Sequence, residues 1–290
     1  MLGAAAARVI AEGGGGCLCS ASAPTFEVST WGVISVSFAV PADAYDRYMG
    51  RYSKRLAGAF ADFARIELGH RVLDVGCGPG ALTSEIATRV GADMTAAADP
   101  SAGFARACAA RVSGPEVRTA SAEALPWPSR SFDTVVSQLV VSFLRDAEAG
   151  VAEMRRVLRP GGMLAACSWD YAGQMQMLRT FWDAALALNP EAPDEARVMA
   201  YTDRDSLSEL WFTAGLRNVE TAPLAVQAEY DDFDDYWQPF LTGTGPGGRY
   251  CISLDADDRA ALRHECFQRL GAPAGPFTLS ARAWAVRGVA

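Results

Sequence analysis

The stretch that decides the fold is VLDVGCGPG, which spans residues 72–80. Three of its first four residues are aliphatic, which is typical of a short buried strand. The glycines that follow allow the backbone to turn sharply and to lie close against a ligand. Downstream, Leu82, Ile86 and Val90 share one face of a predicted helix, which Gly91 ends. The stretch therefore predicts a strand, a glycine loop and a helix in direct succession.

Strands and helices are expected to alternate along the rest of the chain. The remaining predicted strands span 94–98, 117–120, 132–137, 163–168, 219–230 and 277–286. The predicted helices after the first span 102–112, 146–158 and 207–216. Such alternation favours a parallel sheet with helices on both faces and a ligand at the carboxyl edge of the strands. We therefore predict an α/β fold with a Rossmann-like, seven-stranded, mostly parallel sheet.

The chain is expected to hold one domain with added segments. Residues 1–40 carry a glycine run and flanks rich in Ala and Ser, so we predict a disordered N-terminal extension there and a domain over 41–290. An apolar stripe predicts a helix over 44–63. The segments 169–204 and 231–275 exceed the alternating pattern. We expect them to form a small helical cap over the open edge of the sheet.

Composition narrows the range of partners. Lys and Arg total 26 against 34 Asp and Glu, giving a net charge of -8, so a nucleic-acid partner is not expected. The sequence has no apolar run of about eighteen residues, which argues against a membrane partner. The 7 scattered cysteines favour a reducing, cytoplasmic compartment. Neither a metal site nor an oligomeric state is indicated.

Two carboxylates restrict what the glycine loop can bind. On its own the loop also fits the dinucleotide pattern, so a nicotinamide enzyme stays an alternative. Asp74, just before the loop, would repel phosphates and attract a cationic ligand. Asp99 ends the second predicted strand, where ribose hydroxyls need an acceptor in either kind of enzyme. Gly80 comes one residue early for a dinucleotide fingerprint.

Five motifs in order extend this pattern over residues 71–164. They are VLDVGCGPG at 72–80, AAADPS at 96–101, SAEALPWP at 121–128, SFDTVVS at 131–137 and RRVLRPGGML at 155–164. Together they resemble the class I S-adenosylmethionine-dependent methyltransferases, and within them the group similar to ubiquinone and menaquinone biosynthesis methyltransferases. The resemblance implies S-adenosylmethionine as the cofactor and methyl transfer as the activity.

The resemblance also implies a set of cofactor-binding residues. Asp74 would hold the amino-acid end, Asp99 the ribose hydroxyls, and the backbone N–H of Ala122 the adenine ring. Many relatives have Asp where this chain has Ser121, whose hydrogen bond to the adenine amino group would be weaker. Arg51 is expected to reach the carboxylate of the cofactor. The full predicted set is Arg51, Asp74, Gly76, Cys77, Gly78, Gly80, Asp99, Pro100, Ser121, Ala122, Ser137 and Gln138.

The acceptor is predicted to be a small organic molecule. Aromatic side chains are frequent in the segments expected to cover the sheet edge, which suits a small apolar or aromatic acceptor. Trp182 is a further lid candidate. The side chains predicted to line the acceptor site are Tyr45, Tyr48, Trp169, Asp170, Tyr171 and Trp237.

The predicted chemistry is an in-line displacement without a metal. A sulfonium methyl group carries its own activation, so the protein chiefly needs to align the acceptor and exclude water. The sequence identifies no catalytic base. His70 precedes the first strand, at the wrong edge of the sheet, and His264 lies on a polar helix face. Two alternatives remain: a nicotinamide-dependent oxidoreductase and a protein that binds S-adenosylmethionine without transferring methyl.

Overall fold

Seven strands form one sheet within residues 41–290, the part of the chain that the computed structural model describes. The strands are β1 (Val72–Val75), β2 (Thr95–Asp99), β3 (Glu116–Thr119), β4 (Phe132–Gln138), β5 (Leu158–Trp169), β6 (Arg217–Tyr230) and β7 (Phe277–Val289). Their order is β3-β2-β1-β4-β5-β7-β6. The first five run parallel, and β7 pairs antiparallel with both β5 and β6. The predicted fold class is confirmed.

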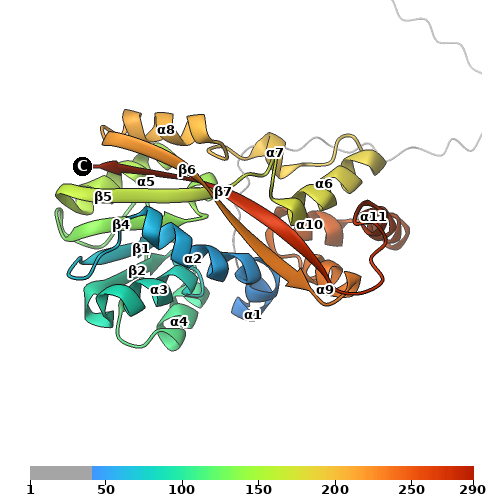
Figure 1. The fold of residues 1–290 in the computed structure, drawn as a ribbon, viewed down its shortest axis with the longest axis horizontal. Helices are drawn as coiled ribbons and strands as arrows, with labels where there is room; N and C mark the ends of the chain where they lie inside the picture. The colour runs from blue at the N-terminus through green and yellow to red at the C-terminus, as the bar shows by residue number, and fades with distance from the viewer. Residues whose placement is uncertain (1–40) are drawn as a thin grey trace, which may run out of the picture. The chain divides into compact units, whose positions relative to one another are not determined.

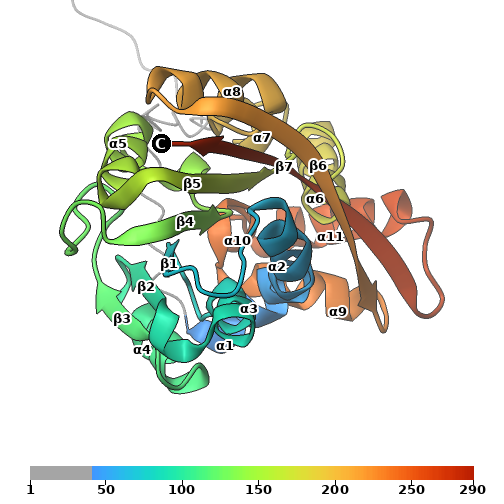
Figure 2. The same ribbon diagram turned by 60° about the vertical axis from the view of Figure 1, so that its left-hand side comes forward.

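Helices cover both faces of the sheet (Figure 2). The flanking helices are α2 (Arg51–Phe63), α3 (Ala81–Val90), α4 (Ala102–Arg111), α5 (Ala147–Val157) and α8 (Arg204–Thr213). Neighbouring residues of β1 face opposite sides: Val72 packs in the same cluster as α2 and α3, and Leu73 packs with α5 and α8. This alternation follows from the two-residue period of a strand and gives the sheet two separate cores.

Polar side chains cap several of these helices, although α8 begins at Arg204, three residues before its predicted start. Asp146 accepts a hydrogen bond from Ala149 N at 2.9 Å and caps α5. Asp203 caps α8 by accepting from Asp205 N and Ser206 N. Caps of this kind satisfy backbone donors that the first helical turn leaves unpaired. The sequence therefore sets the starts of these helices locally.

The first predicted helix, over 44–63, is interrupted. It is resolved as α1 (Ala42–Tyr45), a π-helical turn η1 (Asp46–Gly50) and then α2. A side chain at Gly50 would come within 2.8 Å of Asp46 Oδ1, so glycine allows this wide turn to close. π-Helical turns are frequent at functional sites, and this one carries Tyr48.

The strand β5 also differs from the prediction. It begins at Leu158 and continues through Pro160, Gly161 and Gly162, whereas the turn signals of these residues predicted a start at 163. The pairing with β4 is irregular between Phe132 and Thr134, which accommodates the added residues. The predicted extension over 1–40 lies outside the described residues.

Both segments that exceed the alternating pattern are largely helical. The first contains α6 (Gln176–Leu188) and α7 (Glu195–Val198), and the second contains α9 (Phe233–Trp237), η4 (Gln238–Thr242), α10 (Gly245–Ser253) and α11 (Ala256–Arg269). Strands β6 and β7 continue past the other strands as a long antiparallel pair, and these helices lie alongside it (Figure 1). We refer to α6, α7 and the segment from α9 to α11 as the cap.

Candidate functional site

The loop between β1 and α3 is shaped by three glycines in the left-handed backbone region. Gly76, Gly78 and Gly80 have φ angles of 77°, 51° and 96°. A side chain at Gly76 would lie 2.4 Å from Val140 Cγ2, whereas one at Gly78 would meet nothing within 4 Å. The loop therefore packs tightly against the β4 side and leaves open space at Gly78.

Asp74 is buried directly beneath this loop. One of its oxygens, Oδ2, accepts a hydrogen bond from Thr83 Oγ1 at 2.7 Å. The other, Oδ1, is buried without a partner among the described residues. Burial raises the pKa of this carboxyl to about 7, and the Thr83 hydrogen bond opposes that rise. An ammonium group placed at Oδ1 would satisfy the oxygen and stabilise its charge.

Asp99 braces the same loop from the end of β2. Its Oδ2 accepts from Gly78 N and its Oδ1 from Ser101 N, both at 2.8 Å. The side chain is 6% exposed, and burial raises its pKa. The carboxylate is therefore buried and already accepts two backbone hydrogen bonds without a ligand. The positive φ of Gly78 aims its backbone N–H at the carboxylate, which no sequence pattern could reveal.

The predicted adenine side of the site follows β3. Ala120 N donates to Asp99 O at 3.1 Å, so the chain after β3 is fixed beside the end of β2. Ala122 is buried and Ser121 is half-buried. The structure therefore brings both to the edge that carries Asp99.

Ser137 and Gln138 end β4, and the side chains of both donate hydrogen bonds to backbone carbonyls of the protein. Ser137 Oγ donates to Val75 O at 2.9 Å and links β4 to β1. Gln138 Nε2 donates to Ser53 O at 3.0 Å, which ties the sheet edge to α2. The Oε1 atom of Gln138 is buried and has no partner among residues 41–290.

Buried polar atoms without partners gather at this edge. Within the described part of the chain they are Tyr48 Oη, Ser53 Oγ, Asp74 Oδ1, Gln138 Oε1, Ser142 Oγ and Ser168 Oγ. Each belongs to the carboxyl end of β1, β4 or β5, to the short helix η3 (Val141–Phe143) just after β4, or to the helical segment from η1 to α2. An unpartnered buried polar atom costs about 1–3 kcal/mol. Their concentration at one edge indicates a polar ligand site there.

The aromatic residues predicted to bind the acceptor fall into two groups. Tyr48 packs edge-on against Phe240 with ring centroids 5.5 Å apart, and Trp169 packs edge-on against Tyr52 at 6.1 Å. The first contact joins η1 to the cap, and the second joins the end of β5 to α2. Trp237 instead stacks with Phe233 and Phe181 inside the aromatic core of the cap. The remaining predicted residues, Tyr45 and Tyr171, are half-buried and buried.

Two predicted charged residues have structural partners. Asp170 accepts from Arg282 Nη2 at 2.6 Å and from Gln174 N at 2.8 Å, so it holds the turn after β5 against β7. Arg51 forms a bidentate ion pair with Asp235, with N–O distances of 3.0 and 2.7 Å. Contact of Arg51 with a cofactor requires this pair to open, and that contact stays a prediction.

Comparison with known proteins identifies the family. Residues 73–166 match the family model of a methyltransferase domain. The chain is 31% identical over 155 residues to the malonyl-[acyl-carrier protein] O-methyltransferase of Pseudescherichia vulneris, covering 52% of this chain and 59% of that protein. It is 37% identical over 124 residues to the ubiquinone biosynthesis O-methyltransferase of Sinorhizobium medicae, covering 41% of this chain and 46% of that protein. Residues 73–166 of the chain therefore belong to the methyltransferase domain family.

The fold of this methyltransferase agrees with that assignment. The YcgJ protein of Bacillus subtilis has a similar structure, with a TM-score of 0.52 and 16% identity over 81% of this chain and 97% of that chain. The chain spans less than two thirds of the two curated relatives, 59% and 46% of their lengths. The family's cofactor is S-adenosylmethionine. The buried Oδ1 of Asp74 and the open space at Gly78 fit a cationic ligand that lies against the glycine loop.

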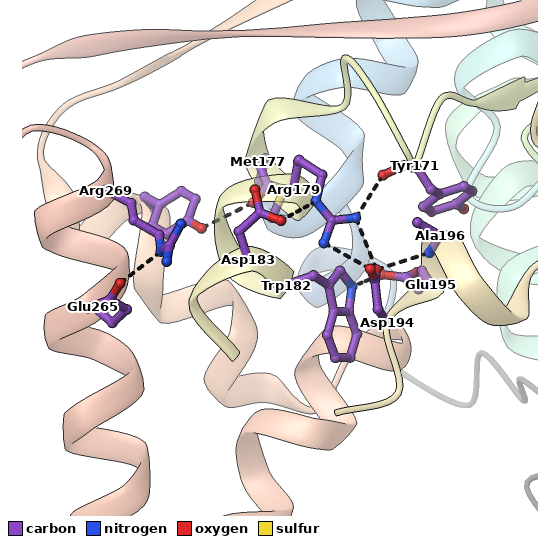
Figure 3. A network of polar contacts seen from close by, with 11 residues as sticks. Tyr171, Met177, Arg179, Trp182, Asp183, Asp194, Glu195, Ala196, Glu265 and Arg269 are labelled. Atoms are coloured by element: carbon purple, nitrogen blue, oxygen red, sulfur yellow. Dashed lines mark hydrogen bonds and ion pairs between the residues drawn. The ribbon is translucent and has the colours of Figure 1, made fainter. Parts of the chain in front are cut away.

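Sequence reasoning missed one ionisable residue of the methyltransferase. Glu195 begins α7, is 2% exposed, and accepts a hydrogen bond from Trp182 Nε1 at 2.7 Å (Figure 3). Burial raises the pKa of this carboxyl to about 7, while the Trp182 hydrogen bond opposes the rise. In the sequence it is one acidic residue among several around Asp194, and no local pattern separates a buried carboxylate from an exposed one.

Neither histidine joins the site. His70 lies before β1, where its Nδ1 is 3.2 Å from Thr134 Oγ1, and His264 is exposed on α11. Among residues 41–290 we find no cluster of three or more His, Cys, Asp or Glu side chains suited to a metal ion. The helices of the same range include none that is both long and apolar enough to cross a membrane.

Proposed function

We propose that this methyltransferase transfers a methyl group from S-adenosylmethionine to a small organic acceptor at the carboxyl edge of β1, β4 and β5. The observation that carries the proposal is the gathering of unpartnered buried polar atoms around the glycine loop at this edge. The names of the curated relatives include O-methyltransferases, which supports oxygen as the methylated atom.

The residues proposed to bind the cofactor, which we call the donor half of the site, have separate proposed tasks. The cofactor, when bound, supplies a methyl group on a positively charged sulfur. Asp74 Oδ1 binds the ammonium group, and the open space at Gly78 admits the ligand to the backbone. Asp99 accepts from the ribose hydroxyls in addition to the two backbone N–H groups that it already holds. The remaining proposed contacts come from Gly76, Cys77, Gly80, Pro100, Ser121, Ala122, Ser137 and Gln138.

The acceptor half is proposed to lie between the sheet edge and the cap. Tyr48 and Trp169 line it from η1 and from the end of β5, with Tyr45 and Tyr171 beside them. Aligning the acceptor and excluding water lower the barrier without a metal. Asp170 and Trp237 support this half through the turn after β5 and the core of the cap.

Binding and transfer separate this function from its two alternatives. We expect S-adenosylhomocysteine to bind in calorimetry, NAD to give no heat, and radiolabelled S-adenosylmethionine to yield labelled small molecules from a pool of hydroxylated aromatics. Heat from NAD would favour the oxidoreductase instead. Tight binding of S-adenosylhomocysteine with no label transferred to any acceptor would favour a protein that only binds the cofactor.

A further inference from the structure

A buried carboxylate in the cap is held in place by a network that the donor site does not use. Arg179 on α6 pairs with Asp194 at 2.9 Å and with Asp183 at 2.8 Å (Figure 3). Asp194 also caps α7 by accepting from Ala196 N at 3.0 Å. Glu195 is the next residue, so the position of its backbone is fixed by this network.

The same network reaches the end of β5. Arg179 Nη1 donates to Tyr171 O at 3.2 Å, and Tyr171 follows β5 by two residues. Figure 3 shows Glu195 beside the indole of Trp182, with the backbone carbonyl of Tyr171 directed toward Arg179. Glu195 is thereby positioned relative to the edge of the sheet where the proposed acceptor half begins.

Two tyrosine hydroxyls lie within electrostatic range of Glu195. After burial, the negative charge of Glu195 is the next cause that raises the pKa of both Tyr48 and Tyr171. The hydroxyl of Tyr48 is one of the buried atoms without a partner in the described chain. The packing agrees: Tyr48 contacts Phe240, and Phe240 stacks on Phe181 beside Trp182, the donor to Glu195. A carboxylate and an unpaired hydroxyl thus lie in one region, next to the proposed acceptor half.

Glu195 has few groups that stabilise its charge. Among residues 41–290, Trp182 Nε1 is its hydrogen-bond donor, and it binds one of the two carboxylate oxygens. Asp194 disfavours the ionised form, whereas Arg249 and Arg179 favour it. Arg179 is already paired with Asp194 and Asp183, so it compensates the charge of Glu195 only in part. A buried carboxylate that is only partly compensated points to a functional task.

We propose that Glu195 is the polar end of the acceptor site and takes up the proton of a neutral hydroxyl, phenolic or enolic, as that oxygen is methylated. This inference rests on the proposed function. A lone pair of the acceptor oxygen forms the new bond to the methyl carbon, and the carbon–sulfur bond breaks with its electron pair left on sulfur. The O–H electron pair stays on the acceptor oxygen, and the proton passes to the carboxylate of Glu195.

The placement of Glu195 also selects among acceptors. A carboxylate acceptor would meet the negative charge of Glu195, and like charges that are both buried repel each other strongly. A neutral hydroxyl instead donates a hydrogen bond to Glu195 and can accept one from Tyr48. The site is therefore expected to prefer a hydroxyl to a free carboxylic acid of the same size.

The test uses three probes of one size on the full chain saturated with S-adenosylhomocysteine. They are 4-methylphenol, 4-methylbenzoate and 4-methylbenzylamine, titrated by calorimetry at pH 8. We expect the phenol to bind at least about tenfold more tightly than the benzoate, which corresponds to about 1.4 kcal/mol. In Glu195→Gln this preference should fall to within about threefold, because glutamine keeps the hydrogen bond with Trp182 but carries no charge.

A matched variant and a turnover measurement complete the design. Glu191→Gln removes an exposed carboxylate from the same segment and should leave the preference unchanged. With S-adenosylmethionine, Glu195→Gln should lower kcat for 4-methylphenol at least tenfold and abolish the pH dependence of kcat around pH 7. The affinity for S-adenosylhomocysteine should stay as in the wild type.

The outcomes distinguish this inference from the function on which it rests. Benzoate binding as tightly as the phenol would overturn the role of Glu195 and leave the methyltransferase proposal standing. The ammonium group of 4-methylbenzylamine should be attracted by the carboxylate, so benzylamine binding that does not weaken in Glu195→Gln would do the same. A preference that Glu195→Gln does not change would do the same, as would failure of all three probes to bind. If S-adenosylhomocysteine itself fails to bind to the wild type, both proposals fall.

Discussion

Asp99 holds two backbone N–H groups with the same oxygens that we propose for the ribose. Asp99→Ala should therefore act on stability and affinity together. Loss of hydrogen bonds to a charged group costs roughly 1.5–3 kcal/mol each, so we expect a weakening of S-adenosylhomocysteine binding by tenfold or more. We also expect a loss of about 1–3 kcal/mol in unfolding free energy, because Gly78 N and Ser101 N lose their acceptor. Calorimetry and denaturant unfolding measure the two effects.

Asp99→Asn separates the two tasks of this residue. Its amide oxygen can still accept from one backbone N–H, so most of the stability should return. Its affinity should stay below that of the wild type, because an amide accepts ribose hydrogen bonds more weakly than a carboxylate. Undiminished affinity in both variants would remove the ribose assignment.

Glu195 makes stability depend on pH in a direction opposite to that of a salt-bridged acid. Its pKa rises from the ordinary 4.5 to about 7 in the folded state. Between these values the folded protein binds more protons than the unfolded chain, so unfolding free energy falls as pH increases through this window. Glu195→Gln removes this loss. Its stability relative to the wild type should therefore be greater at pH 8 than at pH 5, by about 1–3 kcal/mol.

Denaturant unfolding at the two pH values checks this prediction. Asp74 contributes a change of the same sign, but it is present in both proteins and cancels in the comparison. Glu191→Gln serves as the control, because its exposed carboxylate should give no such difference between pH 5 and pH 8. A stability difference for Glu195→Gln that is the same at both pH values would contradict the buried, proton-binding state.

At the scale of elements, the strand–loop–helix unit around the glycines offers a matched pair of substitutions. Gly76→Ala combines a positive φ with overlap against Val140, so it should lose about 2–4 kcal/mol of unfolding free energy. Gly78→Ala meets open space, and only the backbone strain of about 1–2 kcal/mol applies. Its main effect should be on S-adenosylhomocysteine affinity, since the added methyl group occupies the space proposed for the ligand.

The double variant Gly76→Ala with Val140→Ala tests the cause of the larger loss. Removing the two methyl groups of Val140 relieves the overlap, so stability should partly recover relative to Gly76→Ala alone. Thermal unfolding of the four proteins supplies the comparison. If Val140→Ala adds its own loss without any recovery, the packing explanation fails.

The ion pair between α2 and α9 separates two roles for Arg51. The side chain also donates to Glu229 O at 3.0 Å and lies over the Tyr230 ring. If Arg51 serves only to join α2 to α9, Arg51→Ala should lower unfolding free energy by about 1–2 kcal/mol and leave S-adenosylhomocysteine affinity within threefold. Asp235→Asn should behave similarly. A large loss of affinity in Arg51→Ala alone would instead reveal the cofactor contact predicted from the sequence.

The same elements show why some features could be predicted and others could not. Strands such as β4 are buried and bounded by turn residues, so their positions follow from local pattern. The cap depends on contacts between distant residues: Arg51 and Asp235 are 184 positions apart, and the π-helical turn at Gly50 has no periodic signature. For the site, the motifs predicted the glycine loop and its two carboxylates. Glu195 could not be found, because its burial depends on how α6 and α7 pack.

At the scale of the whole molecule, the sequence of residues 1–40 carries no helical or strand period, and residues 41–290 hold hydrophobic cores of their own. A chain that starts at residue 41 should therefore fold and bind S-adenosylhomocysteine like the full chain. We expect its Tm to differ by no more than about 4 °C, the shift that 1 kcal/mol causes in a protein of this size. Starting instead at residue 57 removes Tyr48 and Tyr52 from the first core and should prevent folding. A larger drop in Tm for the first truncation would contradict the prediction.

The position of β7 between β5 and β6 has a consequence for how this enzyme can diversify. The segment from α9 to α11 leaves the sheet at the end of β6 and returns at the start of β7, and the two strands are paired from Tyr230 and Phe277 onward. Its two points of attachment are therefore neighbours, so a replacement of different length can be joined there without moving either strand. The glycine loop and its carboxylates lie far upstream in the chain. Recombination at this junction could therefore exchange one side of the proposed acceptor half while the residues proposed to bind the cofactor remain unchanged.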